Sequence, residues 1–188
     1  MNNERNIVVV LSGPSGVGKG TVAKKIVELN KNVALSISAV TRSPRVGEVD
    51  GREYFFIEKE TFQKEIENGG FLEYSEHFGN FYGTPKQFVL DKLKTKDVLL
   101  EIDVNGGLSV KKNFQEAVLI MIVPPSLEEL KRRLVTRNTE TEEQIALRLQ
   151  RTAFEIAKKE QYDYTVVNDD LDTCVNEILE IIKKEKLK

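Results

Sequence analysis

The residues best suited to chemistry form one glycine-rich segment near the N-terminus, Gly13-Pro14-Ser15-Gly16-Val17-Gly18-Lys19. The β-branched run 7–11 before it predicts a buried strand, and the apolar residues of 21–29 have helical spacing. Glycines at such a turn let successive N–H groups point into one concavity, where the helix start adds positive potential. Lys19 brings a mobile charge to the outer phosphates. We therefore expect a phosphate-binding loop rather than an ordinary glycine-rich turn.

The residue after Lys19 departs from the usual phosphate-loop pattern, which places a serine or threonine hydroxyl there for Mg²⁺. Here the position is Gly20, and Thr21 follows it. Either Thr21 is recruited to the metal, or water, nucleotide and acidic side chains hold it. Asp103, at the end of the predicted buried strand 98–102, suits Mg²⁺ or its bound water, and equally suits the cap of the next helix.

Composition restricts the remaining chemistry. The chain of 188 residues contains one cysteine and one histidine. These counts exclude an internal disulfide and a multi-cysteine metal site, and without a nucleophile elbow His77 does not support a Ser-His-Asp mechanism. We expect Cys174 to be a buried thiol on the closing helix. Chemistry then depends on lysine, arginine, carboxylates and backbone dipoles.

Charge and hydropathy restrict the partners. The formal net charge of -2 gives no general attraction to nucleic acid or an anionic membrane. No apolar stretch approaches the ~20 residues of a membrane span, and the short polar N-terminus has no signal-peptide apolar region. We expect a cytoplasmic protein whose partners are small molecules.

Strand and helix patterns alternate along most of the chain. The later predicted strands cover 33–38, 98–102, 117–123 and 164–167, and helices are expected from about 107, over 127–135, from 141 and over 171–182. Repeated strand–helix–strand units predict a parallel sheet covered on both faces. The middle region breaks this alternation with a loop, a helix and small β elements, predicted at 42–51, 54–57, 61–67, 71–77, a turn-rich 79–85, and 87–93. We interpret it as an inserted lobe.

Eight of the nine arginines fall in two short segments. They are Arg42, Arg45 and Arg52, then Arg132, Arg133, Arg137, Arg148 and Arg151. Because the planar guanidinium binds phosphate by a fork of donors, the two clusters predict two phosphate-handling devices. Arg133 and Arg137 share a helical face before a polar break, and Arg148 returns on the following helix, which suits a lid. Solvated pairing with nearby glutamates is the alternative, which we favour for Arg132 and consider for Arg151.

Several further motifs make a resemblance specific. They are Thr41-Arg42-Ser43-Pro44-Arg45-Val46-Gly47-Glu48, Gly51-x-x-Tyr54-x-Phe56, Phe71-Leu72-Glu73-Tyr74, Tyr82-Gly83-Thr84, Pro124-Pro125-Ser126, Thr139-Glu140-Thr141-Glu142, Arg148-Leu149 and Val167-Asn168-Asp169-Asp170-Leu171. Together with the phosphate loop, and in this order over nearly the whole chain, they resemble guanylate kinase.

The resemblance implies a transferase of purine metabolism that moves the ATP γ-phosphate to GMP, and to dGMP, giving a nucleoside diphosphate with Mg²⁺. It implies a phosphate-loop fold of three α/β/α layers with a parallel core sheet. A single domain would comprise a core (1–38 and 97–188), a GMP-binding lobe of mixed α+β structure (about 39–96) and a helical lid (about 133–150).

Carried over residue by residue, the resemblance assigns Arg42, Arg45, Tyr54 and Tyr82 to the GMP phosphate. It assigns Ser38, Glu73, Thr84 and Asp103 to the guanine side. Guanine presents donors at N1 and N2 that one carboxylate such as Glu73 accepts together, whereas adenine has no such donor pair. Glu101 stands at a GMP-site position where the family often has aspartate, so its longer side chain would place the carboxylate oxygens differently.

On the ATP side, the resemblance implies that the segment from Gly13 to Thr21, including Gly20, wraps the phosphates. Arg137 and Arg148 would come from the lid, and Asn168 would lie near the adenine. Lys19, Arg42, Arg137 and Arg148 are the expected catalytic residues, and Asp103 is the expected contact to Mg²⁺ through water.

Two rival functions remain. A scaffold module of the same fold binds a partner peptide without catalysis, but Lys19 and the arginines are present here. A kinase of the same architecture acts on another phosphorylated sugar or nucleotide, against which Glu73 and Thr84 argue. The sequence does not distinguish a monomer from a homo-oligomer.

Overall fold

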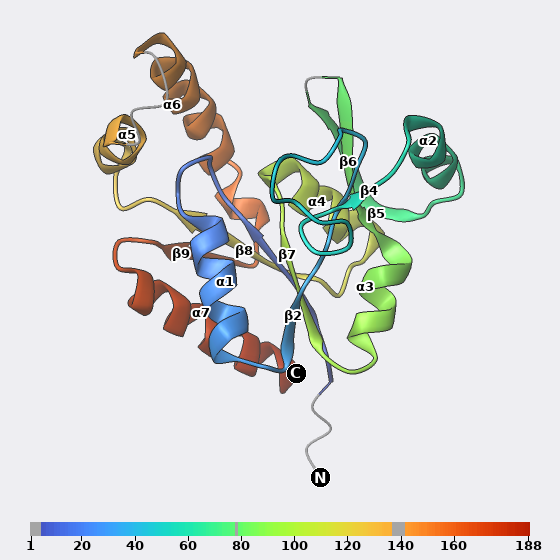
Figure 1. Cartoon of the computed structure of the whole chain (residues 1–188). Coiled ribbons are helices and arrows are strands. Elements are labelled where there is room, and N and C mark those ends of the chain that lie inside the picture. The colour runs from blue at the N-terminus through green and yellow to red at the C-terminus, as the bar shows by residue number, and fades with distance from the viewer. Residues whose placement is uncertain (1–4, 78, 137–141) are drawn as a thin grey trace.

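A five-stranded parallel sheet forms the centre of the computed structural model, which describes residues 5–77, 79–136 and 142–188 (Figure 1). Its strand order is β2 (Val33–Leu35), β7 (Asp97–Glu101), β1 (Val8–Ser12), β8 (Val118–Val123), β9 (Tyr164–Val167), and every pair is parallel. The predicted parallel sheet is therefore confirmed. The central strands β1 and β8 are buried on both faces, which explains their continuous apolar runs.

Helices cover both faces of this sheet because alternate strand residues point to opposite sides. Val9 and Leu11 pack with α1 (Lys19–Leu29) and α7 (Leu171–Lys186). Val8 and Val10 pack with α3 (Lys86–Leu93) and α4 (Val104–Asn113). Cys174 is buried in the first of these cores, as predicted.

A second sheet and a pair of helices rise beyond the carboxyl ends of the parallel strands (Figure 1). The second sheet has the order β4 (Phe55–Phe56), β3 (Ala39–Val40), β6 (Asn80–Pro85), β5 (Phe71–His77), and α2 (Lys59–Glu67) packs on it through Phe62. The helices α5 (Leu127–Thr136) and α6 (Glu142–Ile156) pack together through Leu130, Leu134 and Ile145. A short 3₁₀ helix, η1 (Lys159–Gln161), leads into β9.

Three sequence predictions were wrong in detail. The turn-rich segment 79–85 is mostly strand: Gly79, at φ 74°, makes the turn, and ladder bonds to β5 override the weak strand preference of Asn, Gly and Pro. The single strand expected over 33–38 ends at Leu35, because the chain crosses there to β3 of the second sheet. The helix expected from Gly107 begins at Val104, since Asp103 caps it. None of the helices in the described ranges combines the length and apolar composition needed to cross a membrane.

Candidate active site

The phosphate loop lies between β1 and α1, against the end of β8. Gly18 is the N-cap of α1 and takes φ 98°, a left-handed conformation that side chains rarely adopt. A Cβ on Gly13 would stand 2.2 Å from the carbonyl oxygen of Ile122, so only glycine lets the loop pack this closely. With no acidic residue in its first turn, α1 presents open N–H groups to an anion. The geometry is that of a phosphate cradle.

Lys19 folds back over this loop. Its Nζ donates hydrogen bonds to the carbonyl oxygens of Gly13, at 2.7 Å, and Pro14, at 3.3 Å. Burial lowers the pKa of Lys19, and the negative charges of Glu101, Glu155 and Asp103 oppose that shift. The ammonium is thus held where an outer phosphate on the loop would meet it.

Gly20 faces Glu101, which ends β7. A Cβ on Gly20 would lie 3.5 Å from both carboxylate oxygens of Glu101. Desolvation raises the pKa of Glu101, and the charge of Lys19 opposes the rise. Because Gly20 has no side chain, the position where the usual pattern has a hydroxyl is open space beside the Glu101 carboxylate.

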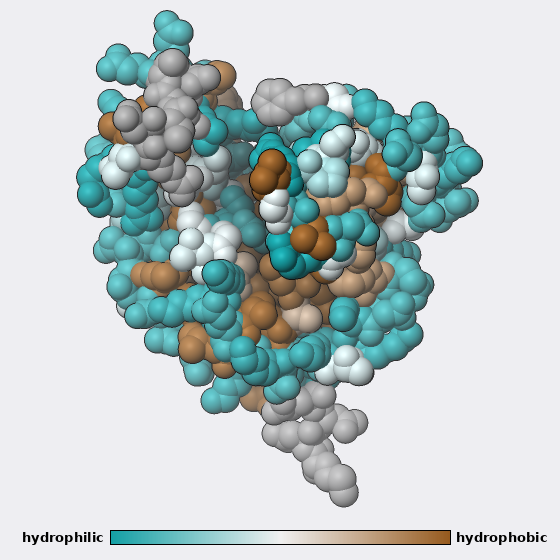
Figure 2. Space-filling model, in the orientation of Figure 1, coloured by the Kyte–Doolittle hydropathy of each residue, from teal (hydrophilic) through white to brown (hydrophobic). Residues whose placement is uncertain are grey.

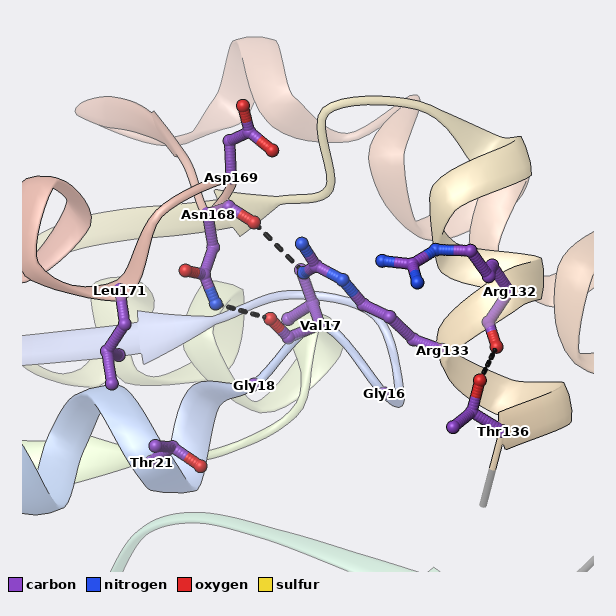
Figure 3. Close-up of a pocket in the computed structure, with 10 residues that line it drawn as sticks. All are labelled: Gly16, Val17, Gly18, Thr21, Arg132, Arg133, Thr136, Asn168, Asp169 and Leu171. Carbon is purple, nitrogen blue, oxygen red and sulfur yellow. Dashed lines mark hydrogen bonds between the residues drawn. The ribbon is translucent and has the colours of Figure 1, made fainter. Parts of the chain in front are cut away.

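A cavity of about 430 Å³ opens on the other side of the loop. The side-chain amide of Asn168 donates to the Val17 carbonyl oxygen over 2.7 Å, and the backbone carbonyl oxygen of Asn168 accepts from Arg133 over 2.9 Å (Figure 3). Arg132 and Thr136 lie on the neighbouring wall. The cavity also includes Gly16, Gly18, Thr21, Asp169 and Leu171. Of the expected ATP-side residues, the structure thus brings together the loop, Thr21 and Asn168.

Helix α6 contacts the phosphate loop. Nη1 of Arg148, on α6, lies 3.0 Å from Oγ of Ser15 and donates to it. Arg137, with 138–141, lies outside the described residues. Arg132 pairs with Glu129 over 2.7 Å, as expected for a solvated helix face. Arg151 pairs with Glu155, a partner the sequence did not suggest.

A second cavity of about 170 Å³ lies between the two sheets, and Figure 2 shows the surface hollowed between the second sheet and the α5–α6 arm. Six expected residues line it: Ser38, Tyr54, Glu73, Tyr82, Glu101 and Asp103. Because Glu101 also faces Gly20, this cavity adjoins the phosphate loop.

Glu73, which lines this cavity from β5, forms a polar pair with Thr84 on β6; Thr84 itself does not line the cavity. Both side chains are buried, and Thr84 Oγ1 donates to Glu73 Oε1 over 2.6 Å. Burial raises the pKa of Glu73 to about 7; the Thr84 bond lowers it, and the charge of Asp103 raises it. The other carboxylate oxygen, Oε2, lies against Gly106 of α4, where an added Cβ would stand 3.1 Å from it.

Arg42 lies beside Tyr54, which lines the same cavity. Its guanidinium stands 5.1 Å from the centre of the Tyr54 ring and makes two hydrogen bonds to Glu48, of 2.6 and 2.8 Å. The Arg42 bond, with a backbone bond from Arg45, lowers the pKa of Glu48 to about 2. Nε of Arg42 is buried and has no hydrogen-bond partner within the described residues. Neither Arg42 nor Arg45 lines the cavity.

Sequence reasoning missed the lining residues Ser75 and His77. The alternation of the strand 71–77 carried the signal for both, because residues 73, 75 and 77 share one face. Arg133, which the sequence grouped with Arg137 on one helical face, lines the cavity beside Asn168.

The chain matches the guanylate kinase family profile over residues 5–185. It is 48% identical to the guanylate kinase of Caldanaerobacter subterraneus subsp. tengcongensis over 97% of this chain and 89% of that protein. It is 49% identical to the guanylate kinase of Oceanobacillus iheyensis over 100% of this chain and 92% of that protein. The crystal structure of guanylate kinase from Anaplasma phagocytophilum superposes with a TM-score of 0.78 at 37% identity, covering 100% of this chain and 90% of that one.

Proposed function

Because the chain belongs to the guanylate kinase family and therefore phosphorylates GMP to GDP with ATP, we propose that its two cavities bind these two substrates. The cavity beside Asn168 and the phosphate loop would hold ATP, and the cavity between the sheets would hold GMP. The contact of Gly20 with Glu101 joins the two, which suits direct transfer from one nucleotide to the other.

For ATP, we propose that residues 13–20 cradle the phosphates, with Lys19 at the outermost one. Thr21, Asn168 and Arg133 would line the nucleoside end. Arg148 contacts Ser15 of the same loop, which supports a lid that brings arginines onto the phosphates; Arg137 is proposed to join it.

For GMP, the pair formed by Glu73 and Thr84 carries the proposal. An ionised Glu73 would accept from N1 and N2 of guanine, and Ser38 and Asp103 would complete this wall. Arg42, Arg45, Tyr54 and Tyr82 are proposed for the phosphate; the unpartnered Nε of Arg42 supports this, since a phosphate oxygen would satisfy it.

The transfer itself requires alignment more than covalent chemistry by the protein. An oxygen of the GMP phosphate attacks the γ-phosphorus of ATP, and the bond to the β–γ bridging oxygen breaks to release ADP. Lys19, Arg42 and the lid arginines would neutralise the charge that develops. Closure of the lid would exclude water, and thereby hydrolysis of ATP.

The residues around Gly20 fit Mg²⁺ held mainly by ATP oxygens and water. Within the described ranges no three acidic or histidine side chains form a metal cage, and Gly20 offers no hydroxyl. Glu101 and Asp103 line the adjoining cavity, and their carboxylates would orient the waters of the ion. When bound, Mg²⁺ supplies charge neutralisation of the phosphates.

We propose that the second sheet with its helices forms the GMP-binding lobe (about 39–96), the parallel sheet the core, and 133–150 the lid. A coupled assay of ADP release with GMP, AMP, CMP and UMP tests the substrate assignment. Turnover should be far faster with GMP or dGMP than with AMP, CMP or UMP, because only guanine offers the donor pair that Glu73 accepts. Equal turnover with AMP would reject this role of Glu73.

A further inference from the structure

One polar contact joins the two sheets across the mouth of the cavity assigned to GMP. His77 ends β5, and Asp103 directly precedes α4; Nε2 of His77 lies 3.5 Å from Oδ2 of Asp103. Each side chain is 37% exposed and lines the cavity. The function proposed above leaves His77 without a role.

The strand geometry places the His77 ring in the wall of this cavity. Residues 73, 75 and 77 share one face of β5, and the register with β6 pairs Glu73 with Thr84 and Ser75 with Tyr82. The imidazole meets the Tyr82 ring edge-on, with 5.9 Å between the ring centres. His77 is therefore continuous with the residues proposed for GMP.

The hydrogen bonds around Asp103 leave one carboxylate oxygen for His77. Oδ1 accepts from the Gly106 N–H over 2.8 Å as the cap of α4, and Oδ2 is the oxygen that lies 3.5 Å from His77 Nε2. Nε2 of His77 is also 3.0 Å from Oγ of Ser75. Because a carboxylate only accepts, whereas a hydroxyl accepts or donates, a proton on Nε2 is the arrangement that suits both neighbours.

The carboxylates around the cavity explain why a donor at His77 matters for Asp103. The cavity is lined by three carboxylates, those of Glu73, Glu101 and Asp103, and His77 is the one residue with a basic side chain among its lining residues. Carboxylates crowded around one small cavity repel one another. A donor on β5 offsets that repulsion at Asp103 and fixes the direction of Oδ2.

We propose that His77 is a positioning residue for the guanine end of the site, holding the Asp103 carboxylate across the cavity mouth in the orientation that GMP requires. This inference rests on the assignment of the cavity to GMP. Loss of the contact would weaken GMP binding and leave the transfer step, carried by Lys19 and the arginines, largely unchanged.

Steady-state kinetics of His77→Leu and His77→Gln test the proposal, with Glu76→Gln on the opposite face of β5 as the control. His77→Leu should raise KM for GMP about tenfold, with kcat and KM for ATP within about twofold. His77→Gln retains a donor at the end of a side chain of similar reach and should recover most of the affinity. An unchanged KM for GMP in folded His77→Leu would overturn the proposal.

The single histidine of the chain allows a second, spectroscopic test in the full, untagged protein. Imidazole ¹⁵N signals should report a proton on Nε2, shift on addition of GMP alone, and change in Asp103→Asn. Imidazole signals that change neither on addition of GMP nor in Asp103→Asn would contradict the contact between His77 and Asp103. If Glu73→Gln also keeps normal GMP turnover, the GMP assignment itself fails; if only the His77 variants behave as wild type, His77 alone is excluded.

Discussion

Thr84 donates a hydrogen bond of 2.6 Å to Glu73 between directly opposed positions of β6 and β5, and both side chains are buried. Burial raises the pKa of Glu73 to about 7, and the Thr84 bond restrains that rise. The carboxylate proposed to select guanine is thus poised where a small change in pH alters its charge.

We predict that GMP affinity falls as the pH decreases through about 7. A protonated Glu73 would present a hydroxyl to a guanine donor, which removes one acceptor. Calorimetric titration with GMP alone measures the profile, and Glu73→Gln should flatten it. Thr84→Val removes the bond that lowers the pKa, so its inflection should move to higher pH. A wild-type profile that is flat across this range would contradict the ionisation of Glu73 as the controlling event.

The raised pKa of Glu73 also makes the stability of the nucleotide-free protein depend on pH. Because the folded pKa of about 7 lies above the ordinary 4.5, Glu73 contributes stability that is fully present below pH ~4.5. That contribution is lost as the pH rises through about 7. Thermal unfolding of wild type and Glu73→Gln should therefore converge at low pH, with the variant relatively more stable above neutrality.

Glu73→Gln should also cost selectivity. The glutamine amide offers one acceptor, but its NH₂ opposes a guanine donor, so kcat/KM for GMP should fall by ~2 kcal/mol, or about 30-fold. KM for ATP serves as the internal control. Retention of full GMP turnover would mean that guanine is recognised by other residues.

Lys19→Met keeps the length of the side chain and removes its charge. Since that charge acts most on the transferring phosphate, kcat should fall at least ~10²-fold while GMP binding survives. Lys19 Nζ also bonds Gly13 and Pro14, so unfolding must be measured beside kinetics. A folded variant with near-normal turnover would remove Lys19 from the catalytic group.

The sequence predicted what local patterns determine. The apolar run before Gly13 and the alternation of 71–77 identified their strands, because burial on two faces or one leaves a distinct periodicity. The segment 79–85 was misread, since its strand depends on pairing with β5, which is far stronger than its own preference.

For the site, residue types and the resemblance predicted Glu73, Thr84 and Asn168, whose roles stay predictions, but contacts made by packing needed the fold. The pairing of Arg42 with Glu48, the approach of Glu101 to Gly20 and that of His77 to Asp103 arise from chain packing rather than spacing. Asp103 shows the limit well: it caps α4, which confirms one reading of its position, whereas its contact to Mg²⁺ through water stays a prediction, made from a residue that lines the cavity.

We expect the lid to close fully only when both nucleotides are bound, because two phosphate-rich ligands attract the arginines of opposite sides. Spin labels on cysteines introduced at the exposed positions Leu147 and Gln63 would measure the approach of α6 to α2. Cys174 is buried, which favours labelling at the introduced sites. GMP with a non-hydrolysable ATP analogue should shorten the distance beyond either ligand alone; an unchanged distribution would count against closure.

The last prediction concerns how Mg²⁺ is held without a hydroxyl at position 20. Gly20 faces Glu101, whereas Thr21 lines the cavity beside Asn168, because one step along a helix turns the side chain by roughly 100°. We therefore expect Thr21→Val to be mild, with little change in the Mg²⁺ concentration for half-maximal activity.

Asp103→Asn should instead raise that Mg²⁺ concentration and weaken GMP binding together, since this carboxylate lines the GMP cavity and is proposed to orient water on the ion. Glu101→Gln should raise the Mg²⁺ requirement with less effect on GMP, because Glu101 adjoins the phosphate loop. Activity across Mg²⁺ titrations, with GMP binding measured in the absence of ATP, separates the two effects. A large Mg²⁺-dependent loss in well-folded Thr21→Val would instead show that the Thr21 hydroxyl has replaced the missing ligand.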